Sequence, residues 1–409
     1  MPLLESYREA FPGSNTPHIS YGLAFPEACA KHVIGTFNAS RVYIIASKTL
    51  STQTDALQRL EIALDTKVVG KRIGMTPHTL WSECLEVTED ARRLDADLII
   101  TLGAGSLTDA AKIVSLALAN YASTTSDLDA LHSGRDWTSF HDIIKTAVVP
   151  IISIPTTLSG GEYQKLAGGT KDSTQQKYGF NHGTVGPSLV ILDAELTTTT
   201  PNQFWLSTGV RAIDHCVETL CSITTHDVSA NEAAADGLRQ LVPGLMRCKK
   251  DTQDLEARHL CQLGVIKAMT AVRGGVELGA SHGIGHQLGP LGVGHGETSC
   301  ILLPAVCRYN STVNEERQQK VKDILWQQAE VKSMLFEQEL QPGTADLNDI
   351  LDCIISQLGM PRSLKAVGVR EEKLDLLATN SLNDKWCQTN PIPLKTKAQV
   401  LEILSSVVG

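Results

Sequence analysis

The sequence predicts a two-domain protein with an α/β N-terminal half, in which helices flank a parallel sheet, and an all-α C-terminal half. The chain has 409 residues, and single cores stop growing at roughly 250–300 residues, so two domains are expected. Apolar, β-branched runs alternate with helical periodicity in the first half, which is typical of a parallel sheet covered on both faces. After about residue 193 strand signals become scarce and helical periodicity dominates.

The elements of the first half follow one another as strand and helix. Short apolar runs predict buried strands, whereas spacings of three and four residues predict helices. Thr76 and Pro77 are typical of a helix start, as cap and first-turn proline. Strands are expected at Arg41–Ala46, Val68–Ile73, Ala96–Leu102, Val148–Ile154 and Leu189–Asp193, and helices at Gln53–Leu64, Thr76–Leu94 and Thr108–Asn120.

In the second half, helical periodicity predicts a domain of packed helices. A polar, Thr-rich stretch with a proline, Thr197–Pro201, indicates the boundary, which gives domains 1–198 and 199–409. The polar segment Ser123–Asp142 is expected to be a long excursion from the first domain. Helices are expected at Trp205–Cys221, Ser229–Leu245, Asp254–Thr270 and Gln318–Leu335.

Composition excludes several classes of protein. The net charge of −9 argues against a nucleic-acid partner, because such proteins present a basic face. The longest apolar stretches, such as Ala147–Pro155, are shorter than the ~20 residues of a membrane span, and the first residues show no apolar signal segment. The ten cysteines are dispersed without a C-x-x-C pair, which favours buried thiols in a cytoplasmic protein. The expected partner is a small anionic or carbonyl substrate, and a homodimer is compatible with the sequence.

A glycine loop lies between the strand that ends at Leu102 and the next helix. Gly103, Ala104, Gly105 and Ser106 are small, so the backbone can approach an oxygen-rich group closely. The N–H groups at the helix start, aided by the helix dipole, then favour a phosphate. The alternative is a tight turn without a ligand, and spacing alone does not separate the two.

Four histidines form the second candidate site. His282 and His286 are four residues apart, which places both imidazoles on one helix face. His295 follows among glycines, and His215 lies upstream. The pattern indicates either a metal site or a proton relay. Core or cap histidines are the alternative, and the residues alone leave both open.

The two segments together resemble the iron-containing alcohol dehydrogenase family. Its glycine signature corresponds to Gly103–Lys112, its P-T-T strand end to Pro155–Thr157, and its H-x-x-x-H-x-L-G segment to His282–Gly289, followed by His295 and a strand expected at Ile301–Pro304. The agreement runs in order from about Ser20 to the C-terminus. Within the family, the loop, Cys216–Glu218 and the His-Gly-Glu-Thr run at 295–298 are most similar to the maleylacetate reductase branch.

The resemblance implies an N-terminal dinucleotide-binding domain, a helical C-terminal domain and catalysis in the cleft between them. The pyrophosphate would lie on Gly103–Ser106 with Asp109 nearby, while Thr156 and Thr157 would border the adenosine or ribose.

The resemblance also bears on the choice between NADPH and NADH. Relatives that prefer NAD often carry an aspartate at this position, and its charge repels a 2′-phosphate. This chain has Ser47 there, so the repulsion is absent. Lys48 is placed to neutralise that phosphate. The cofactor is therefore expected to be NADPH or either form, and the alternative is that both are ordinary surface residues.

One departure from the family pattern concerns the metal. In metal-dependent members an aspartate four residues before the first ligand histidine binds the cation, and here Arg211 occupies that position before His215. A guanidinium cannot ligate a metal and repels one, so no metal is expected. Asp214 is expected to pair with Arg211. The alternative is a three-histidine site of His215, His282 and His295, although a shortened loop is expected to displace His295.

The sequence therefore predicts a metal-independent NAD(P)H-dependent reductase of a small keto acid or unsaturated carbonyl compound, similar to maleylacetate reductase. Arg211 would anchor a carboxylate or polarise a carbonyl, and His286 or His282 would donate the proton. The alternatives are a non-redox reaction such as dehydration or isomerisation, a metal-dependent alcohol dehydrogenase, and a non-catalytic interaction protein.

Overall fold

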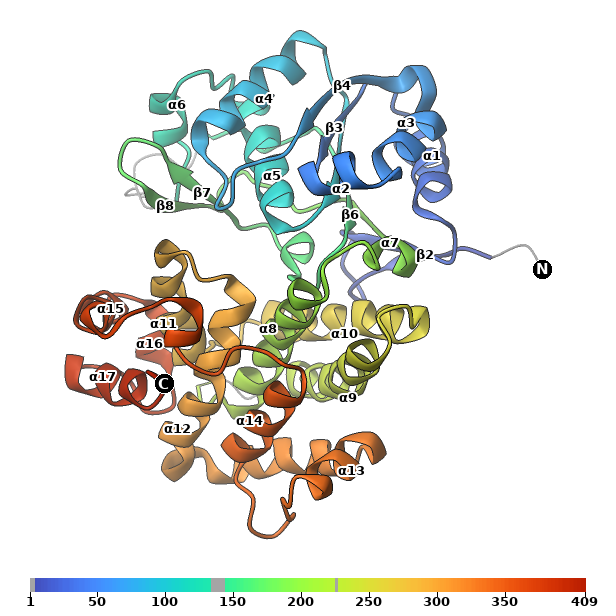
Figure 1. Ribbon diagram of the computed structural model, residues 1–409. Helices are drawn as coiled ribbons and strands as arrows, with labels where there is room; N and C mark the ends of the chain where they lie inside the picture. Colours follow the sequence, from blue (N-terminus) through green and yellow to red (C-terminus); the bar gives the residue numbers. More distant parts are fainter. Residues whose placement is uncertain (1–3, 134–143, 225–226) are drawn as a thin grey trace. The chain divides into compact units, whose positions relative to one another are not determined.

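A computed structural model describes residues 4–133, 144–224 and 227–409 of the chain. The chain divides into two compact units, Met1–Thr199 and Thr200–Gly409. The first unit contains strands and helices, and the second contains helices (Figure 1). The predicted fold class, an α/β domain followed by an all-α domain, is confirmed.

A seven-stranded sheet forms the centre of the first unit. The strand order is β1-β2-β9-β6-β5-β3-β4, and each neighbouring pair is parallel except β1 with β2. Buried parallel strands need helices on both faces, as the near-continuous apolar runs predict. The strands are β1 Ser6–Glu9, β2 His18–Tyr21, β3 Val42–Ala46, β4 Val68–Ile73, β5 Leu98–Gly103, β6 Ile151–Pro155 and β9 Leu189–Leu192.

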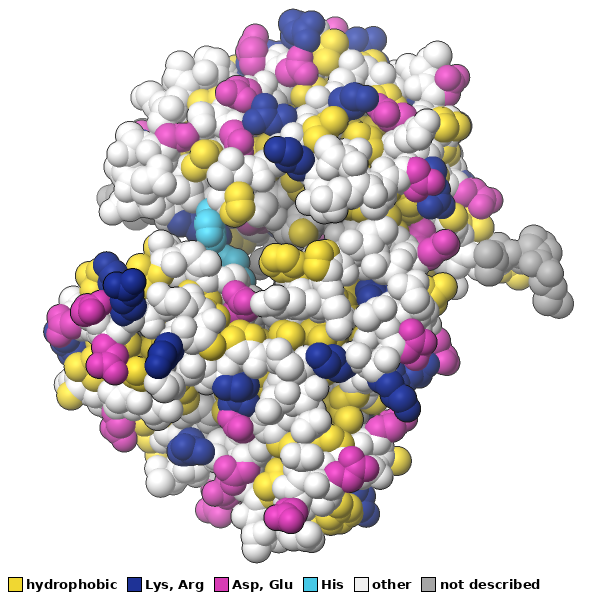
Figure 2. Space-filling model, viewed as in Figure 1, with side chains coloured by type: hydrophobic (Ala, Val, Ile, Leu, Met, Phe, Trp, Pro, Cys, Tyr) yellow, Lys and Arg dark blue, Asp and Glu magenta, His cyan; other side chains and the backbone are white. Residues whose placement is uncertain are grey.

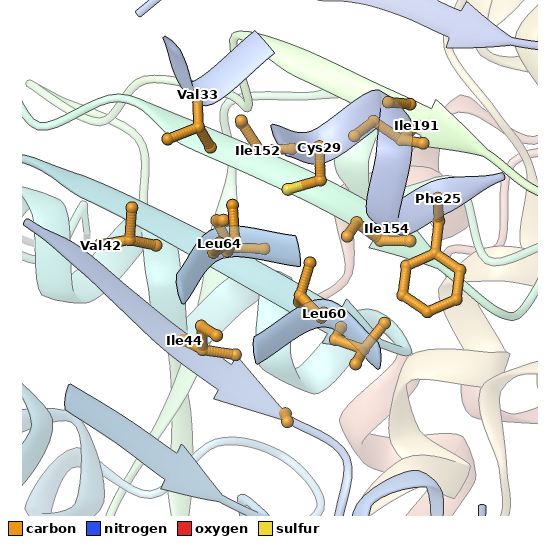
Figure 3. Packing of buried hydrophobic residues seen from close by; sticks show 14 of the residues in the cluster. Phe25, Cys29, Val33, Val42, Ile44, Leu60, Leu64, Ile152, Ile154 and Ile191 are labelled. Carbon is orange, nitrogen blue, oxygen red and sulfur yellow. The ribbon is translucent and has the colours of Figure 1, made fainter. Parts of the chain in front are cut away.

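Side chains alternate between the two faces of this sheet. Val42 and Ile44 pack with the helices on one face, which are α1 and α3 (Figure 3). Tyr43 and Ile45, the residues between and after them, pack with α4 and α5 on the other face. This period of two follows from strand geometry. Because Ile44 is fully buried, its replacement by alanine is expected to cost about 2–5 kcal/mol.

The helices of the first unit differ from the prediction at three starts, and one of them is α5, which begins at Gly105 instead of Thr108. The predicted helix Thr76–Leu94 begins only at Trp81, because His78 and Thr79 have positive φ values of 71° and 59°, which no helix allows. The predicted helix Gln53–Leu64 is interrupted after Gln53. The helices are α1 Phe25–Gly35, α2 Lys48–Gln53, α3 Ala56–Leu64, η1 Asp65–Lys67, α4 Trp81–Arg93, α5 Gly105–Ala119, α6 Thr125–Asp129, η3 Gly161–Tyr163 and α7 Ala194–Thr197.

Two segments of the first unit were not foreseen in this form. A hairpin of β7 (Ala167–Lys171) and β8 (Gln176–Phe180) pairs antiparallel outside the main sheet. The predicted excursion Ser123–Asp142 begins with α6, whose N-cap Thr124 accepts a hydrogen bond from the Asp127 N–H. Its later part, 134–142, lies outside the described residues.

The described residues of the second unit form helices and connecting loops, without a strand. The strand expected at Ile301–Pro304 is wrong, because these residues lie inside helix α12. A four-residue apolar run fits a buried helix as well as a buried strand. The helices are α8 Asn202–Cys221, α9 Val228–Lys250, α10 Leu255–Arg273, α11 Ala280–Leu288, η4 Gly289–Leu291, α12 His295–Trp326, α13 Ala329–Glu337, α14 Leu347–Gln357, η5 Lys365–Val367, η6 Glu371–Lys373, α15 Leu374–Ser381, α16 Lys385–Thr389 and α17 Lys397–Ser405.

The surface charges, the helices and the cysteines can be compared with what the composition predicts. Lys and Arg are interspersed with Asp and Glu on the visible face, without a large field of one sign (Figure 2). In the part of the chain that the structure describes, no helix is both long and apolar enough to cross a membrane. All ten cysteines are free thiols, and all but the half-buried Cys353 are buried.

Candidate active site

The predicted nucleotide-binding residues of the first unit meet at one edge of the sheet. The carboxyl ends of β3, β5 and β6 lie side by side there, because these strands are parallel neighbours. The Ser47 N–H donates to Leu102 O (2.9 Å), and the Thr156 N–H donates to Gly103 O (3.3 Å). The helix after β3 packs on one face and the helix after β5 on the other. Such a topological switch point is where open α/β sheets bind ligands.

The glycine loop has the geometry of a phosphate cradle. Gly103 has a φ of +141°, and a Cβ there would lie 2.8 Å from Leu107 Cδ1 and 2.9 Å from Ser47 Cβ. Gly103 is therefore required by the fold. A Cβ at Gly105, by contrast, would meet only Ser159, at 3.8 Å. Helix α5 begins at Gly105 after the N-cap Ala104, which provides no side-chain cap. Its first N–H groups can therefore bind an anion.

The other predicted cofactor residues flank this loop. Asp109, on the second turn of α5, lies 3.6 Å from the Lys112 ammonium. Thr157 Oγ1 is hydrogen-bonded to Ser159 Oγ (2.9 Å). Lys48 is exposed and forms no ion pair with the described residues, which leaves its charge available to a ligand.

Lys112 has a role that sequence reasoning missed, although it belongs to the glycine signature. Its side chain is fully buried and donates hydrogen bonds to Gly161 O (2.7 Å) and Leu166 O (2.9 Å). These bonds tie the loop after β6 to α5. Burying a charge is costly unless it is hydrogen-bonded, so Lys112 fixes the position of that loop relative to the glycine cradle.

In the second unit, α8 and α11 bring the predicted catalytic residues together. Arg211 and His215 lie four residues apart on α8, hence on one helix face. The His215 ring stacks on His282 of α11, with centroids 4.6 Å apart and an interplanar angle of 30°. His286 follows one turn later on α11. His295 is the first residue of α12, and its Cε1 lies 3.8 Å from the site of a Cβ on Gly289.

Arg211 is half-buried and only weakly hydrogen-bonded. Its Nη1 donates to Ser299 Oγ at 3.3 Å and to Thr298 Oγ1 at 3.5 Å, which is the long limit for a hydrogen bond. No salt bridge joins it to any described carboxylate. Burial lowers the pKa of Arg211, and the charges of Asp214 and Glu218 oppose this shift. Most of the five donors of this guanidinium are therefore unused by the described residues.

The expected ion pair between Asp214 and Arg211 is wrong. Asp214 Oδ2 instead accepts hydrogen bonds from Ser281 Oγ (2.7 Å) and Ser299 Oγ (2.6 Å). These hydroxyls come from α11 and α12, so the position of Asp214 on α8 alone could not reveal them. Burial raises the pKa of Asp214 to about 6, although Arg211 and the two hydroxyls act in the opposite direction.

Glu218 contacts His282 and the backbone at the start of α11. It accepts the N–H groups of Gly279 and Ser281, both at 2.9 Å, and its Oε2 lies 2.8 Å from His282 Nδ1. His282 Nε2 is buried without a hydrogen-bond partner among the described residues. Burial, and secondarily the Arg211 charge, lower the pKa of His215 to about 3 and that of His282 well below its usual range. Both imidazoles are therefore neutral at pH 7.

The three histidines of the metal-dependent pattern, His215, His282 and His295, do not form a cation site among the described residues, because they do not bring their ligand atoms within 4.8 Å of one another. Asp214, Glu218 and His282 do, and this buried group could hold a metal ion. In the structure, His282 Nδ1 contacts Glu218 Oε2 directly, at 2.8 Å. The cationic Arg211 stands where a carboxylate ligand is needed.

His286 has a partner that sequence reasoning missed. Its Nδ1 lies 2.8 Å from Asp384 Oδ2, although 98 residues separate them. The side chain of His286 is 37% exposed, against 14% for Asp384. The Trp386 ring contacts both histidines, with centroids 5.0 Å from His286 and 5.5 Å from His282. No local sequence signal connects this segment with His286.

Comparison with known proteins agrees with both units. Residues 24–194 match the iron-containing alcohol dehydrogenase model, and residues 205–408 match the C-terminal model of the Fe-containing alcohol dehydrogenase family. The chain is 39% identical to dehydrogenase FUM7 of Gibberella moniliformis, over 97% of each chain. It is 41% identical to dehydrogenase ALT3 of Alternaria alternata, over 90% of this chain and 99% of the relative.

Solved structures show the same fold. The maleylacetate reductase of Rhizobium sp. strain MTP-10005 has a TM-score of 0.74 and 23% identity, covering 100% of this chain and 98% of that one. The sulfoacetaldehyde reductase of Bifidobacterium kashiwanohense, solved in complex with NAD+, has a TM-score of 0.78 and 21% identity, covering 100% and 99%. The family models and the two dehydrogenase relatives span nearly the whole chain, and the chain therefore belongs to the iron-containing alcohol dehydrogenase family and is an oxidoreductase.

Proposed function

We propose that the protein is an NAD(P)H-dependent reductase of a small anionic carbonyl compound, a keto acid or an unsaturated carbonyl acid, and that it works without a divalent metal. The observation that carries this proposal is Arg211, a half-buried guanidinium among neutral histidines with most of its donors unused. A planar fork of donors matches a carboxylate bidentately. The likeness to maleylacetate reductase supports the same class of substrate.

The first unit supports the choice of a nicotinamide cofactor. The glycine cradle, the uncapped start of α5 and the sheet edge at Ser47 and Thr156 fit a dinucleotide with its pyrophosphate on Gly103–Ser106. The exposed Lys48 beside Ser47 favours NADPH, because no acidic side chain at that position repels a 2′-phosphate. The NAD+ complex of the sulfoacetaldehyde reductase supports the cofactor class.

In the proposed reaction, Arg211 binds the substrate carboxylate and fixes its orientation. A reduced nicotinamide, when bound, supplies the hydride that adds to the electrophilic carbon. His286 gives a proton to the oxygen that becomes the alcohol, or to the neighbouring carbon when a C=C bond is reduced. The role goes to His286 because His282 is buried and its pKa lies well below its usual range. Neutral His215 and the unpartnered Nε2 of His282 remain as hydrogen-bonding groups for the substrate.

The test compares a keto acid with its neutral methyl ester as substrates. The rate with each is measured as the loss of NADPH absorbance. If Arg211 binds the carboxylate, kcat/KM for the acid should exceed that for the ester by roughly 30- to 4,000-fold, since an unpaired buried charge costs about 2–5 kcal/mol. Equal values for acid and ester would contradict the proposal. Product formation without NADPH oxidation would point instead to the non-redox alternative, dehydration or isomerisation.

A further inference from the structure

The segment Asp384–Trp386 is held against α11 by contacts that depend on a glycine. A Cβ on Gly283, the residue after His282, would lie 2.6 Å from Cys387 Sγ and 2.8 Å from Cys387 N. Only a residue without a side chain allows α16 to approach this closely. Thr389 Oγ1 also donates to Leu278 O (2.8 Å), just before α11. The position of Asp384 relative to His286 is therefore fixed by packing.

Asp384 uses its two carboxylate oxygens for two tasks. Oδ1 accepts the Trp386 N–H (2.9 Å) as the N-cap of α16, and Oδ2 contacts His286 Nδ1 (2.8 Å). A carboxylate only accepts hydrogen bonds, so the proton of that contact belongs to Nδ1. The other ring nitrogen, Nε2, is left to exchange a proton with a ligand. The Trp386 ring, tilted at 35° to His286, restricts rotation of the imidazole.

We infer that Asp384 is a positioning residue that fixes the tautomer and orientation of His286, so that Nε2 is the atom that carries the transferred proton. The inference rests on the proposed reduction, in which His286 is the proton donor. When Nε2–H protonates the substrate oxygen, His286 passes from imidazolium to the neutral Nδ1–H form, and Asp384 Oδ2 accepts the hydrogen bond of the Nδ1 proton that remains. The bond broken is Nε2–H, and the bond formed is O–H. Solvent then returns the proton to Nε2.

Replacement of Asp384 by asparagine tests this directly. The amide oxygen must face the Trp386 N–H to keep the cap, so the amide NH2 group must face His286 Nδ1. Nδ1 then becomes an acceptor, and the proton of the neutral ring moves to Nε2. The Nδ1–H form that must remain after Nε2 gives up a proton is then no longer the favoured one. We expect kcat to fall by roughly 10²- to 10⁴-fold, with KM for the keto acid changed less than about threefold because Arg211 is untouched.

A second variant and a matched control complete the kinetic arm. Asp384→Ser keeps an N-cap oxygen but removes the acceptor for His286, and it should also lower kcat. Asp227→Asn changes the N-cap of another helix, α9. The Asp227 carboxylate accepts hydrogen bonds from the Ser229 hydroxyl and the Ala230 N–H. This control variant should leave kcat unchanged. Wild-type kcat in a folded Asp384→Asn or Asp384→Ser variant would overturn the inference.

A spectroscopic readout separates this inference from the proposed function. Nitrogen-15 NMR of histidine-labelled protein, with His286 identified from the spectrum of His286→Gln, reports which ring nitrogen carries the proton. Nδ1–H in the wild type and Nε2–H in Asp384→Asn support the inference even if no carbonyl substrate is reduced. The same tautomer in both proteins overturns it, and a failure of the wild type to oxidise NAD(P)H overturns only the proposed function.

Discussion

Replacement of Arg211 gives the most specific prediction about substrate binding. Two variants are informative: Arg211→Lys keeps the charge, and Arg211→Ala removes both charge and donors. Among the described residues, the wild-type side chain forms hydrogen bonds only through Nη1, with contacts of 3.3 and 3.5 Å. The remaining donors can form two parallel bonds to a carboxylate, each worth about 1.5–3 kcal/mol when charged.

The expected losses follow from this count of bonds. Arg211→Lys loses one of two charged hydrogen bonds, so kcat/KM for a keto acid should fall by roughly 10- to 150-fold. Arg211→Ala loses the pair, and a loss of about 2–5 kcal/mol corresponds to roughly 30- to 4,000-fold. The neutral ester of the same acid should be affected less than about threefold, because it offers no anion to the guanidinium.

The assay is initial-rate loss of NADPH absorbance with acid and ester, on protein whose thermal unfolding matches the wild type. Arg239→Ala is the matched control, since Arg239 is exposed on α9 and forms an ion pair with Asp236 of the same helix. It should leave both substrates unaffected. If Arg211→Ala retains wild-type kcat/KM on the acid, or lowers acid and ester equally, Arg211 does not bind the carboxylate.

Three further predictions concern the first unit. Gly105→Val should weaken nucleotide binding by about tenfold or more in calorimetry while the protein stays folded, because a Cβ there meets only Ser159; unchanged affinity would contradict the phosphate cradle. Ser47→Asp should shift the ratio of NADPH to NADH affinity toward NADH by about tenfold or more, since a carboxylate repels the 2′-phosphate; an unchanged ratio refutes the assignment. Burial raises the pKa of Glu5, but hydrogen bonds from Lys31, Ser20 and His32 outweigh it and lower the pKa to about 2. Its stabilisation is therefore present above pH 4.5 and lost as the pH falls toward 2. Glu5→Gln should be less stable by about 2–3 kcal/mol in denaturant titrations at pH 7, and a deficit that persists at pH 2 contradicts the assignment.

Periodicity predicted the sheet because its strands are buried on both faces. Val42–Ala46 is a continuous apolar run and Leu98–Gly103 is largely apolar. Such runs, alternating with helices, are typical of a parallel sheet that is covered on both faces. The start of α4 was missed because the positive φ values of His78 and Thr79 carry no strong residue signal. Ile301–Pro304 was misassigned because four apolar residues suit either a strand or a buried helix.

The candidate site was predictable where its residues are close in sequence. The spacing of His282 and His286 on one helix, and of Arg211 and His215 on another, follows from helix geometry. The partners of these residues come from distant segments: Ser299 for Asp214, and Asp384 for His286. Such contacts depend on how helices pack, and helix positions alone place Asp214 next to Arg211 without showing which neighbour it bonds.

If Arg211 takes the place of a metal in the reduction of an anionic carbonyl compound, the enzyme must work without iron or zinc. The most direct measurement is elemental analysis of purified enzyme together with its rate of NADPH oxidation before and after chelation. We expect well under one iron or zinc per chain and a rate on the keto acid that chelation leaves unchanged. Stoichiometric metal bound through His215, His282 and His295, with activity lost on its removal, would contradict it.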